Sequence, residues 1–394
     1  MRVFIHCPTI ATGGTELIHQ FARCLMERNV ETYVVYMNAE STSTPTPDSF
    51  AKYGVKYVAA YVDAKDSVLV LAETQVHLLS LCKLGKVVVW WMSVDNYLVY
   101  GRSFKGTNVD YFGLRQRKDV LHLCQSEYSK RFIEKEFGIT NAVFLKDYIN
   151  DDIVNFAKIY ADKMKRRNII LYNPRKGYNN IEPIIKACRK DIIWKPLQGM
   201  KPHEMAALMC MAKVYIDFGH HPGKDRIPRE AAACGCCIIT NRIGSAAFKE
   251  DVFIPDKWKV EDMSDVEGTL QRIYELVDNY DICKTDYEEY QQRILGEKEE
   301  FFSDIDKFVL SISQLKENIV QSVNSNLLIY DTMQEIVDEM KRLLENACQS
   351  EESGEVNEMI NSLLDADYCI NIFRESLYAK MRNYIKNESR LTKK

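Results

Sequence analysis

The sequence lacks the segments that mark membrane-spanning and secreted proteins. No apolar run approaches the about 20 residues that a transmembrane helix needs. The opening MRVFIHCPTI has neither the apolar region nor the small-residue cleavage site of a signal peptide. The twelve cysteines are scattered along the chain, as is usual in a reducing compartment. We therefore expect a cytoplasmic protein, with peripheral binding at the inner membrane face as the alternative.

The sequence also lacks an excess of charge of one sign and a clear metal-binding motif. Its net charge of −4 gives no reason to expect a nucleic-acid partner. No Asp-x-Asp sequence follows an expected strand, and VDN at 94–96 comes nearest. His220 and His221 do not have the spacing of zinc ligands. We predict no metal and no other bound cofactor.

The 394 residues, of which 46% are apolar, suffice for two domains. Short apolar segments alternate with helical patterns, and the segments show little polar alternation, which is typical of parallel sheets covered on both faces. In the first half the expected strands are residues 2–8, 30–37, 67–73, 86–93 and 120–126. In the second half they are residues 169–174, 191–197, 213–219 and 236–241.

This pattern predicts an α/β protein with two doubly wound Rossmann-like domains facing a cleft, over residues 1–150 and 166–260. The stretch 150–168 is interpreted as the connection between them. Residues 261–394 are expected to form a helical extension. Its last helix, 368–387, has apolar residues at helical spacing and a basic tail, and we expect it to pack on the body of the protein. A membrane-surface contact or an oligomer contact through these helices is the alternative.

Two of three turns that follow expected strands carry small residues and suit a diphosphate. Arg175 and Lys176 precede Gly177, so two cations stand beside a residue that lets backbone approach a ligand. A solvated turn is the alternative. Gly244, Ser245 and Ala246 follow strand 236–241 and offer space and backbone donors. Tight helix–strand packing is the alternative for that turn.

The third turn, DFGHHPGKDRIPREAAACGC at 217–236, concentrates charge between a strand and a helix. Pro228 is expected to begin the helix, where free N–H groups favour an anion. Lys224 and Arg226 lie just before it, and Glu230 is expected in its first turn, where it can accept hydrogen bonds from sugar hydroxyls. Glu230 as a partner of the helix dipole is the alternative. An ion pair of Asp225 with a neighbouring arginine is equally open.

The acceptor side is expected at the strand ends of the first domain. Ser93, Asp95 and Asn96 follow the two tryptophans of VVVWWMSVDNYL, and aromatic and short polar side chains suit a sugar. Trp90 is more typical of a core, whereas Trp91 is predicted to contact the acceptor. Glu73 ends another strand and points to the same cleft.

The turns and the TGGTELIHQFARCL, LYNPRKG, IPREAAACG and IITNRIGSA segments make residues 1–260 resemble the GT-B glycosyltransferases, in particular the retaining family 4 type that includes bacterial capsule and lipopolysaccharide enzymes. The sequence departs from the family's Glu-x7-Glu pattern, because Pro222 occupies the position of the first Glu. Asp225 or the backbone near Gly223 is expected to substitute for it.

The resemblance implies a retaining enzyme that transfers a sugar from a nucleotide-sugar co-substrate to a glycan or lipid-linked acceptor in surface polysaccharide synthesis. Because no Asp-x-Asp motif is present and fixed cations are abundant, we predict that the transfer is metal-independent. The alternatives are a non-catalytic GT-B-like regulatory protein and a GT-B epimerase or phosphorylase. The candidate catalytic residues are Glu230, Asp95 and Asp225. The candidate donor-binding residues are Gly14, Arg175, Lys176, Gly177, Gly223, Lys224, Arg226, Arg229, Glu230, Gly244, Ser245 and Ala246. The candidate acceptor-binding residues are Glu16, Glu73, Trp91, Ser93 and Asn96.

Overall fold

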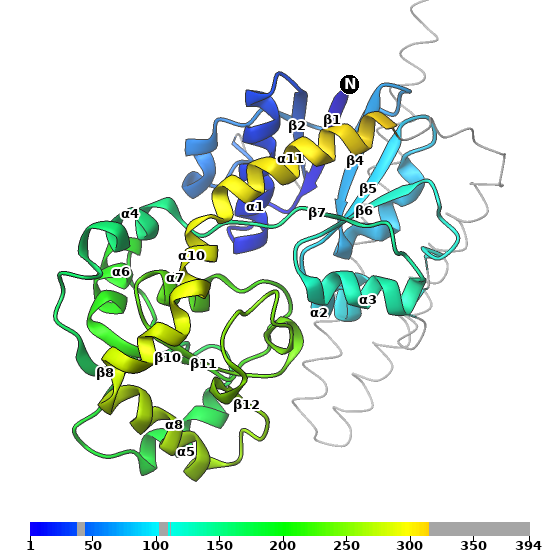
Figure 1. Cartoon of the computed structure of the whole chain (residues 1–394). Helices are drawn as coiled ribbons and strands as arrows, with labels where there is room; N and C mark the ends of the chain where they lie inside the picture. Colours follow the sequence, from blue (N-terminus) through cyan, green and yellow to red (C-terminus); the bar gives the residue numbers. More distant parts are fainter. Residues whose placement is uncertain (38–43, 102–108, 111, 315–394) are drawn as a thin grey trace, which may run out of the picture.

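A computed structural model describes residues 1–37, 44–101, 109–110 and 112–314 (Figure 1). It confirms the predicted α/β fold with two parallel sheets and flanking helices. The first sheet has the strand order β3-β2-β1-β4-β5-β6-β7 and the second has the order β12-β11-β10-β8-β9. Both sheets reverse their strand order near the middle, between β1 and β4 and between β8 and β10. Ligands of doubly wound sheets bind at such switch points, outside the carboxyl ends of the strands.

All nine expected strands form, because both faces of each sheet are covered and the strands are therefore apolar. The two-residue strands β3, β7 and β12, at the sheet edges, were not predicted. The strands of the first sheet are β1 (Arg2–Cys7), β2 (Glu31–Tyr36), β3 (Tyr57–Val58), β4 (Ser67–Ala72), β5 (Lys86–Trp91), β6 (Val120–Cys124) and β7 (Val143–Phe144). Those of the second sheet are β8 (Arg167–Tyr172), β9 (Ile193–Pro196), β10 (Ala212–Asp217), β11 (Cys237–Asn241) and β12 (Lys259–Val260).

The helices pack against both faces of the sheets. In the first domain they include α1 (Gly13–Glu27), α2 (Val94–Asn96), α3 (Glu127–Phe137), and the short helices η2 (Asp48–Tyr53), η3 (Glu73–Leu81) and η4 (Tyr97–Gly101). In the second domain they include α4 (Asp151–Tyr160), α5 (Tyr178–Ala187), α6 (Pro202–Met211), α7 (Arg226–Ala233), η5 (Gly244–Ala247) and η6 (Asp256–Trp258). They are followed by α8 (Val266–Asp278), α9 (Tyr280–Cys283), η7 (Lys284–Tyr287), α10 (Glu288–Leu295) and α11 (Glu297–Gln314).

The segment 150–168 is more than a connection. It contains α4, whose Ile153 and Ala157 are buried in the core of the second domain, where α4 contacts α6 and α7. The stretch looks polar because only this one face of the helix is covered.

The helices after residue 260 belong to the two domain cores rather than to a separate appendage over the described range. Helices α8 to α10 contribute buried residues to the second core, among them Ile273 and Tyr287. Helix α11 then crosses back and lies along the first domain (Figure 1), where Phe301, Ile305 and Phe308 are fully buried. The predicted helix 368–387 and its basic tail lie outside the described residues. No helix in the described ranges has the length and hydropathy needed to cross a membrane.

Candidate functional site

A cavity of about 730 Å³ lies between the two domains, at the switch point of the first sheet. Its walls come from the ends of β1, β4 and β5, from the start of α1 and from the turn that precedes α7. Residues predicted to form the site in the first domain and in the second domain therefore line the same cavity. The predicted residues that line the cavity are Gly14, Glu73, Ser93, Asn96, Gly223, Lys224, Asp225 and Arg226.

The turn before α7 is fixed directly to the first domain. The backbone N–H of Val94 donates to the carbonyl of Pro222 at 2.9 Å. A Cβ on Gly223 would overlap the carbonyl oxygen of Met92, so only glycine permits this close approach. Packing between the domains is therefore sufficient to require glycine at position 223, without any ligand contact.

Arg226 reaches across the cleft to the first domain. Its guanidinium donates to Glu16 on α1 at 2.6 Å and lies 3.4 Å from Asp147, in the segment that follows β7. Glu16 also accepts from the Tyr53 hydroxyl at 2.7 Å. Burial raises the pKa of Glu16, but Arg226 and Tyr53 outweigh it, and the net pKa lies below its ordinary value. The carboxylate of Glu16 is thus committed to an ion pair.

Arg229 and Lys224 lie in the same network. Arg229 is only 1% exposed and contacts Asp147 at 2.8 Å and Glu297 of α11 at 2.6 Å. Lys224 contacts the other oxygen of Glu297 at 2.7 Å. Burial raises the pKa of Asp147, but the cations around it prevail and hold the net pKa below its ordinary value. Each cation of this turn is therefore matched by a buried carboxylate.

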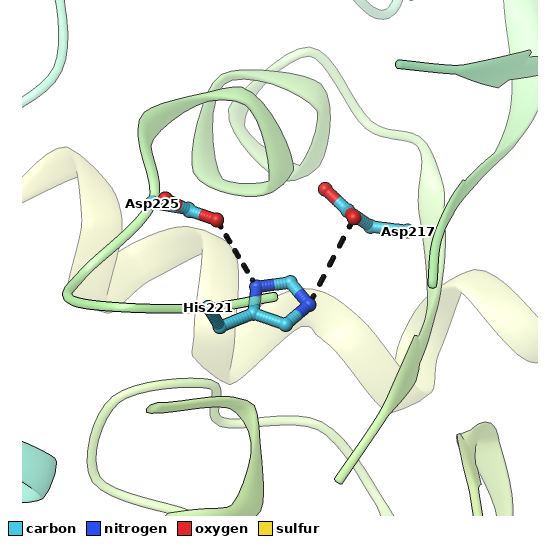
Figure 2. Close-up of side chains that lie close together, drawn as sticks. All are labelled: Asp217, His221 and Asp225. Atoms are coloured by element: carbon cyan, nitrogen blue, oxygen red, sulfur yellow. Dashed lines mark ion pairs between the residues drawn. The ribbon is translucent and has the colours of Figure 1, made fainter. Parts of the chain in front are cut away.

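A second charged cluster lies at the switch point of the second sheet (Figure 2). Asp217 ends β10, and Asp225 stands immediately before α7. Between them lies His221, which is fully buried. Its Nδ1 is 3.2 Å from Asp225 and its Nε2 is 3.9 Å from Asp217. Lys176, from the turn after β8, contacts both oxygens of Asp225 at 3.0 and 3.1 Å.

Asp217, His221 and Asp225 are the one group in the described ranges that brings three candidate metal ligands together. One ligand atom from each residue lies within 4.8 Å of the others. The two ring nitrogens of His221 face opposite carboxylates (Figure 2), whereas a metal binds one nitrogen and needs the other ligands on that same side. The ammonium of Lys176 also holds Asp225. The geometry fits a protonated imidazole better than a metal.

Glu230 lies in the fifth position of α7, because the helix begins at Arg226 and not at Pro228 as predicted. This removes Glu230 from the first turn, where the helix dipole acts most strongly. Glu230 as a whole is 5% exposed. Burial raises its pKa to about 7, against the opposing effect of Arg226 and Arg229.

Glu73 lies at the floor of the cavity, at the end of β4. One of its oxygens accepts the backbone N–H of Met92 at 3.0 Å. Burial raises its pKa to about 7, although the backbone donors oppose this. Nearby, burial lowers the pKa of His77 to about 4, so that imidazole is neutral. This first-domain side of the cavity is thus weakly charged near neutral pH.

Several predicted site residues lie away from the cavity lining. Trp91 is fully buried, and its indole donates to His122 at 3.0 Å, so it offers no face to a sugar. Asp95 accepts from Tyr128 at 3.2 Å beside the cleft. Arg175 is exposed to solvent in the turn between β8 and α5.

The small residues of the other two turns serve close backbone packing. A Cβ on Gly177 would overlap the carbonyl of Phe218, and one on Gly244 would overlap the carbonyl of His221. Ser245 is buried, and its hydroxyl donates to the carbonyl of Gly223 at 2.6 Å. Ala246 is buried beside it. These residues therefore pack against the backbone of the turn 217–225 and fix its conformation.

Asp147, Glu297 and the pairing of His221 with two aspartates were not identified from the sequence. Asp147 follows the two-residue strand β7, and Glu297 opens a charged helix, so neither position is distinctive in the sequence. The pairing of His221 with Asp217 and Asp225 has a signal, since the three are spaced four residues apart.

The fold is that of GT-B glycosyltransferases. The chain is similar in structure to a glycosyltransferase from Rickettsia africae, with a TM-score of 0.54 and 12% identity over 80% of this chain and 98% of that one. It is similar to sucrose-phosphate synthase from Thermosynechococcus elongatus, with a TM-score of 0.53 and 12% identity over 80% and 99% of the two chains. WaaG, a glycosyltransferase involved in lipopolysaccharide biosynthesis, has a TM-score of 0.51 and 11% identity over 80% and 100%. No family model and no curated protein matches the sequence.

Proposed function

We propose that this protein is a glycosyltransferase that moves a sugar from a nucleotide-sugar donor to a hydroxyl of a glycan or lipid-linked acceptor. The observation that carries the proposal is the interdomain cavity, which lies at the switch point of the first sheet and is also lined by the turn between β10 and α7 of the second domain. A donor nucleotide on the second sheet then presents its sugar to an acceptor held by the first. The neighbours named above add fold-level support, since the first and third are named as glycosyltransferases.

The donor diphosphate would bind between the turn after β8 and the beginning of α1. Lys176 and the exposed Arg175 supply charge on one side. Gly14 lines the other side, where the N-terminus of the fifteen-residue helix α1 favours an anion. Glu230 would accept hydrogen bonds from donor hydroxyls, and Asp225 would stand near the departing group.

The acceptor would enter against Glu73, Ser93 and Asn96. With a pKa of about 7, Glu73 is suited to accept the proton of an acceptor hydroxyl at neutral pH. We also propose that transfer is metal-independent, with fixed cations and backbone dipoles stabilising the leaving diphosphate. Retention of the anomeric configuration and a role in surface polysaccharide synthesis are proposed from the sequence resemblance alone.

The first test is a thermal-shift screen of UDP-, GDP- and ADP-hexoses on the full chain, followed by a donor hydrolysis and transfer assay. A ligand present at 100 times its Kd stabilises the folded state by about 2.7 kcal/mol. We expect at least one nucleotide sugar to raise the Tm and to be turned over. Absence of any shift and of any turnover would overturn the proposal.

A second candidate function follows from the ion pairs of the turn before α7. Lys224, Arg226 and Arg229 are each paired with buried carboxylates. This pairing favours a non-catalytic GT-B-like protein, because cations already paired are less available to a phosphate. Donor binding without hydrolysis or transfer to any acceptor would support this candidate.

A further inference from the structure

The charges of the His221 cluster do not cancel when the His221 imidazole is neutral. Asp217 and Asp225 are two carboxylates, and Lys176 alone would leave them with one uncompensated negative charge. Such a cluster would repel the diphosphate that Lys176 is proposed to bind. Only a protonated His221 brings the sum to zero.

The geometry supports a proton on both nitrogens of His221. Asp225 faces Nδ1, and Asp217 faces Nε2 at the opposite edge of the ring (Figure 2). A neutral imidazole would turn one lone pair toward a carboxylate at a buried position, which is unfavourable. The imidazolium places its positive charge between the two carboxylates. Both contacts are ion pairs, since neither ring nitrogen has a hydrogen-bond partner among the described residues.

We propose that His221 is an internal counter-charge: as an imidazolium it compensates Asp217 and Asp225, so that Lys176 remains able to bind the donor diphosphate. This inference rests on the proposed function. It makes His221 a positioning residue for donor binding, since the fully buried ring does not reach the cleft. The backbone of His221 is held separately, because its carbonyl accepts the N–H of Ser245 at 2.9 Å.

The charged and titratable groups on the elements around the ring are consistent with a protonated His221. The end of β10 presents Asp217, which also accepts from the Tyr215 hydroxyl at 2.8 Å. The start of α7 presents Asp225, and the turn after β8 presents Lys176. Helix η5 brings no titratable side chain. Burial lowers the pKa of His221, but the two aspartates outweigh burial and Lys176, and the net pKa is raised.

The test measures the affinity of the full chain for a nucleotide sugar by calorimetry between pH 5.5 and about pH 9. The probe is the tightest of UDP-glucose, GDP-mannose and ADP-glucose. Their phosphates are diesters that do not titrate in this range. We expect affinity to fall as the pH rises through the folded-state pKa of His221, because deprotonation restores the net negative charge.

The variants separate charge from packing. His221→Asn should lower affinity about tenfold, which corresponds to about 1.4 kcal/mol. Adding Asp217→Asn, at the carboxylate of the cluster that does not line the cavity, removes one negative charge and should restore most of the lost affinity. His220→Asn is the matched control, because that neighbouring side chain is 79% exposed and should have no effect. Lys176→Ala tests the donor site itself.

The variants distinguish failure of this inference from failure of the proposed function. Loss in Lys176→Ala with unchanged binding in His221→Asn overturns this inference and leaves the proposed function intact. Loss in His221→Asn without recovery in the double variant assigns the histidine a packing role and overturns it too. No binding of any probe overturns both proposals. If His221→Asn fails to fold, NMR of the imidazole in the wild type and in Asp225→Asn decides: the pKa should exceed 6.5 and fall in the variant. Binding of Zn²⁺ or Mn²⁺ that His221→Asn abolishes would establish a metal site instead.

Discussion

Arg226 of the second domain and Glu16 of the first form a 2.6 Å ion pair across the cleft, with about one sixth of each side chain exposed. The pair joins the beginnings of α7 and α1, whose N-terminal ends both border the cavity. It is therefore a direct contact between the two domains.

Arg226→Ala should destabilise the protein strongly. The substitution leaves Glu16 and Asp147 without one of their cations in a partly buried network, and breaking a buried pair costs about 3–5 kcal/mol. Urea denaturation measures the loss. The control is Arg23→Ala, which removes an exposed pair with Glu27 and should cost about 0.3–0.5 kcal/mol. Similar losses in the two variants would contradict a structural role for the Arg226 network.

Glu230→Gln should be more stable than the wild type at high pH and slower in transfer. Burial raises the pKa of Glu230 from 4.5 to about 7, so the folded state keeps its proton to higher pH than the unfolded state. The stability of the wild type therefore falls as the pH rises from about 4.5 to about 7. Glutamine has no proton to lose and avoids this penalty.

The measurement for Glu230→Gln combines Tm at pH 5 and pH 8 with the transfer rate. We expect the Tm advantage of the variant to grow between these pH values and its rate to fall, because glutamine accepts hydrogen bonds less strongly than a carboxylate. Normal turnover, whatever the Tm, would exclude Glu230 from the donor site.

Asp251→Ala should loosen the contact between the domains. Asp251, between η5 and η6 of the second domain, accepts the N–H groups of Glu127 at 2.8 Å and Tyr128 at 3.0 Å, and so caps α3 of the first domain. Loss of such a cap costs about 0.5–2 kcal/mol. Hydrogen exchange should accelerate at the N-terminus of α3.

The matched control for this cap is Asp265→Ala. Asp265 caps α8 by accepting from Gly268 within the second domain, so its loss should cost similar stability without changing exchange in α3. Equal exchange at α3 in both variants would show that Asp251 does not hold the domains together.

Transfer activity should survive EDTA. Fixed cations and the N-terminus of α1 are proposed to stabilise the diphosphate, and the Asp217–His221–Asp225 cluster is arranged as an ion-paired histidine. The rate is measured after dialysis against EDTA, with Mg²⁺ and Mn²⁺ added back. A loss of turnover that either metal reverses would disprove metal independence.

Local patterns in the sequence were sufficient for the fold class. Buried parallel strands need apolar residues on both faces, so segments such as β5 and β11 stand out from their surroundings without knowledge of their partners. The strand-to-helix turns were located for the same reason. The amphipathic helix α4 was the exception, because its narrow buried stripe lies among many charges.

Ion-pair partners depended on the tertiary structure. Lys224 and Arg229 were predicted to bind a donor, but their nearest anion belongs to Glu297, about 70 residues away on a helix that returns to the first domain. A charge in a sequence shows only that compensation is needed. Which group supplies it depends on distances that folding creates.

The sequence by itself determined two Rossmann-like sheets and the position of charged turns at their edges, because apolar runs and turn residues act locally. Only the tertiary structure decided which of these charges remain available to a ligand. It placed His221 between Asp217 and Asp225, and it directed Arg226 toward Glu16. The physical reason is that desolvation and Coulomb attraction depend on burial and on separation in space, which residue identity alone does not specify.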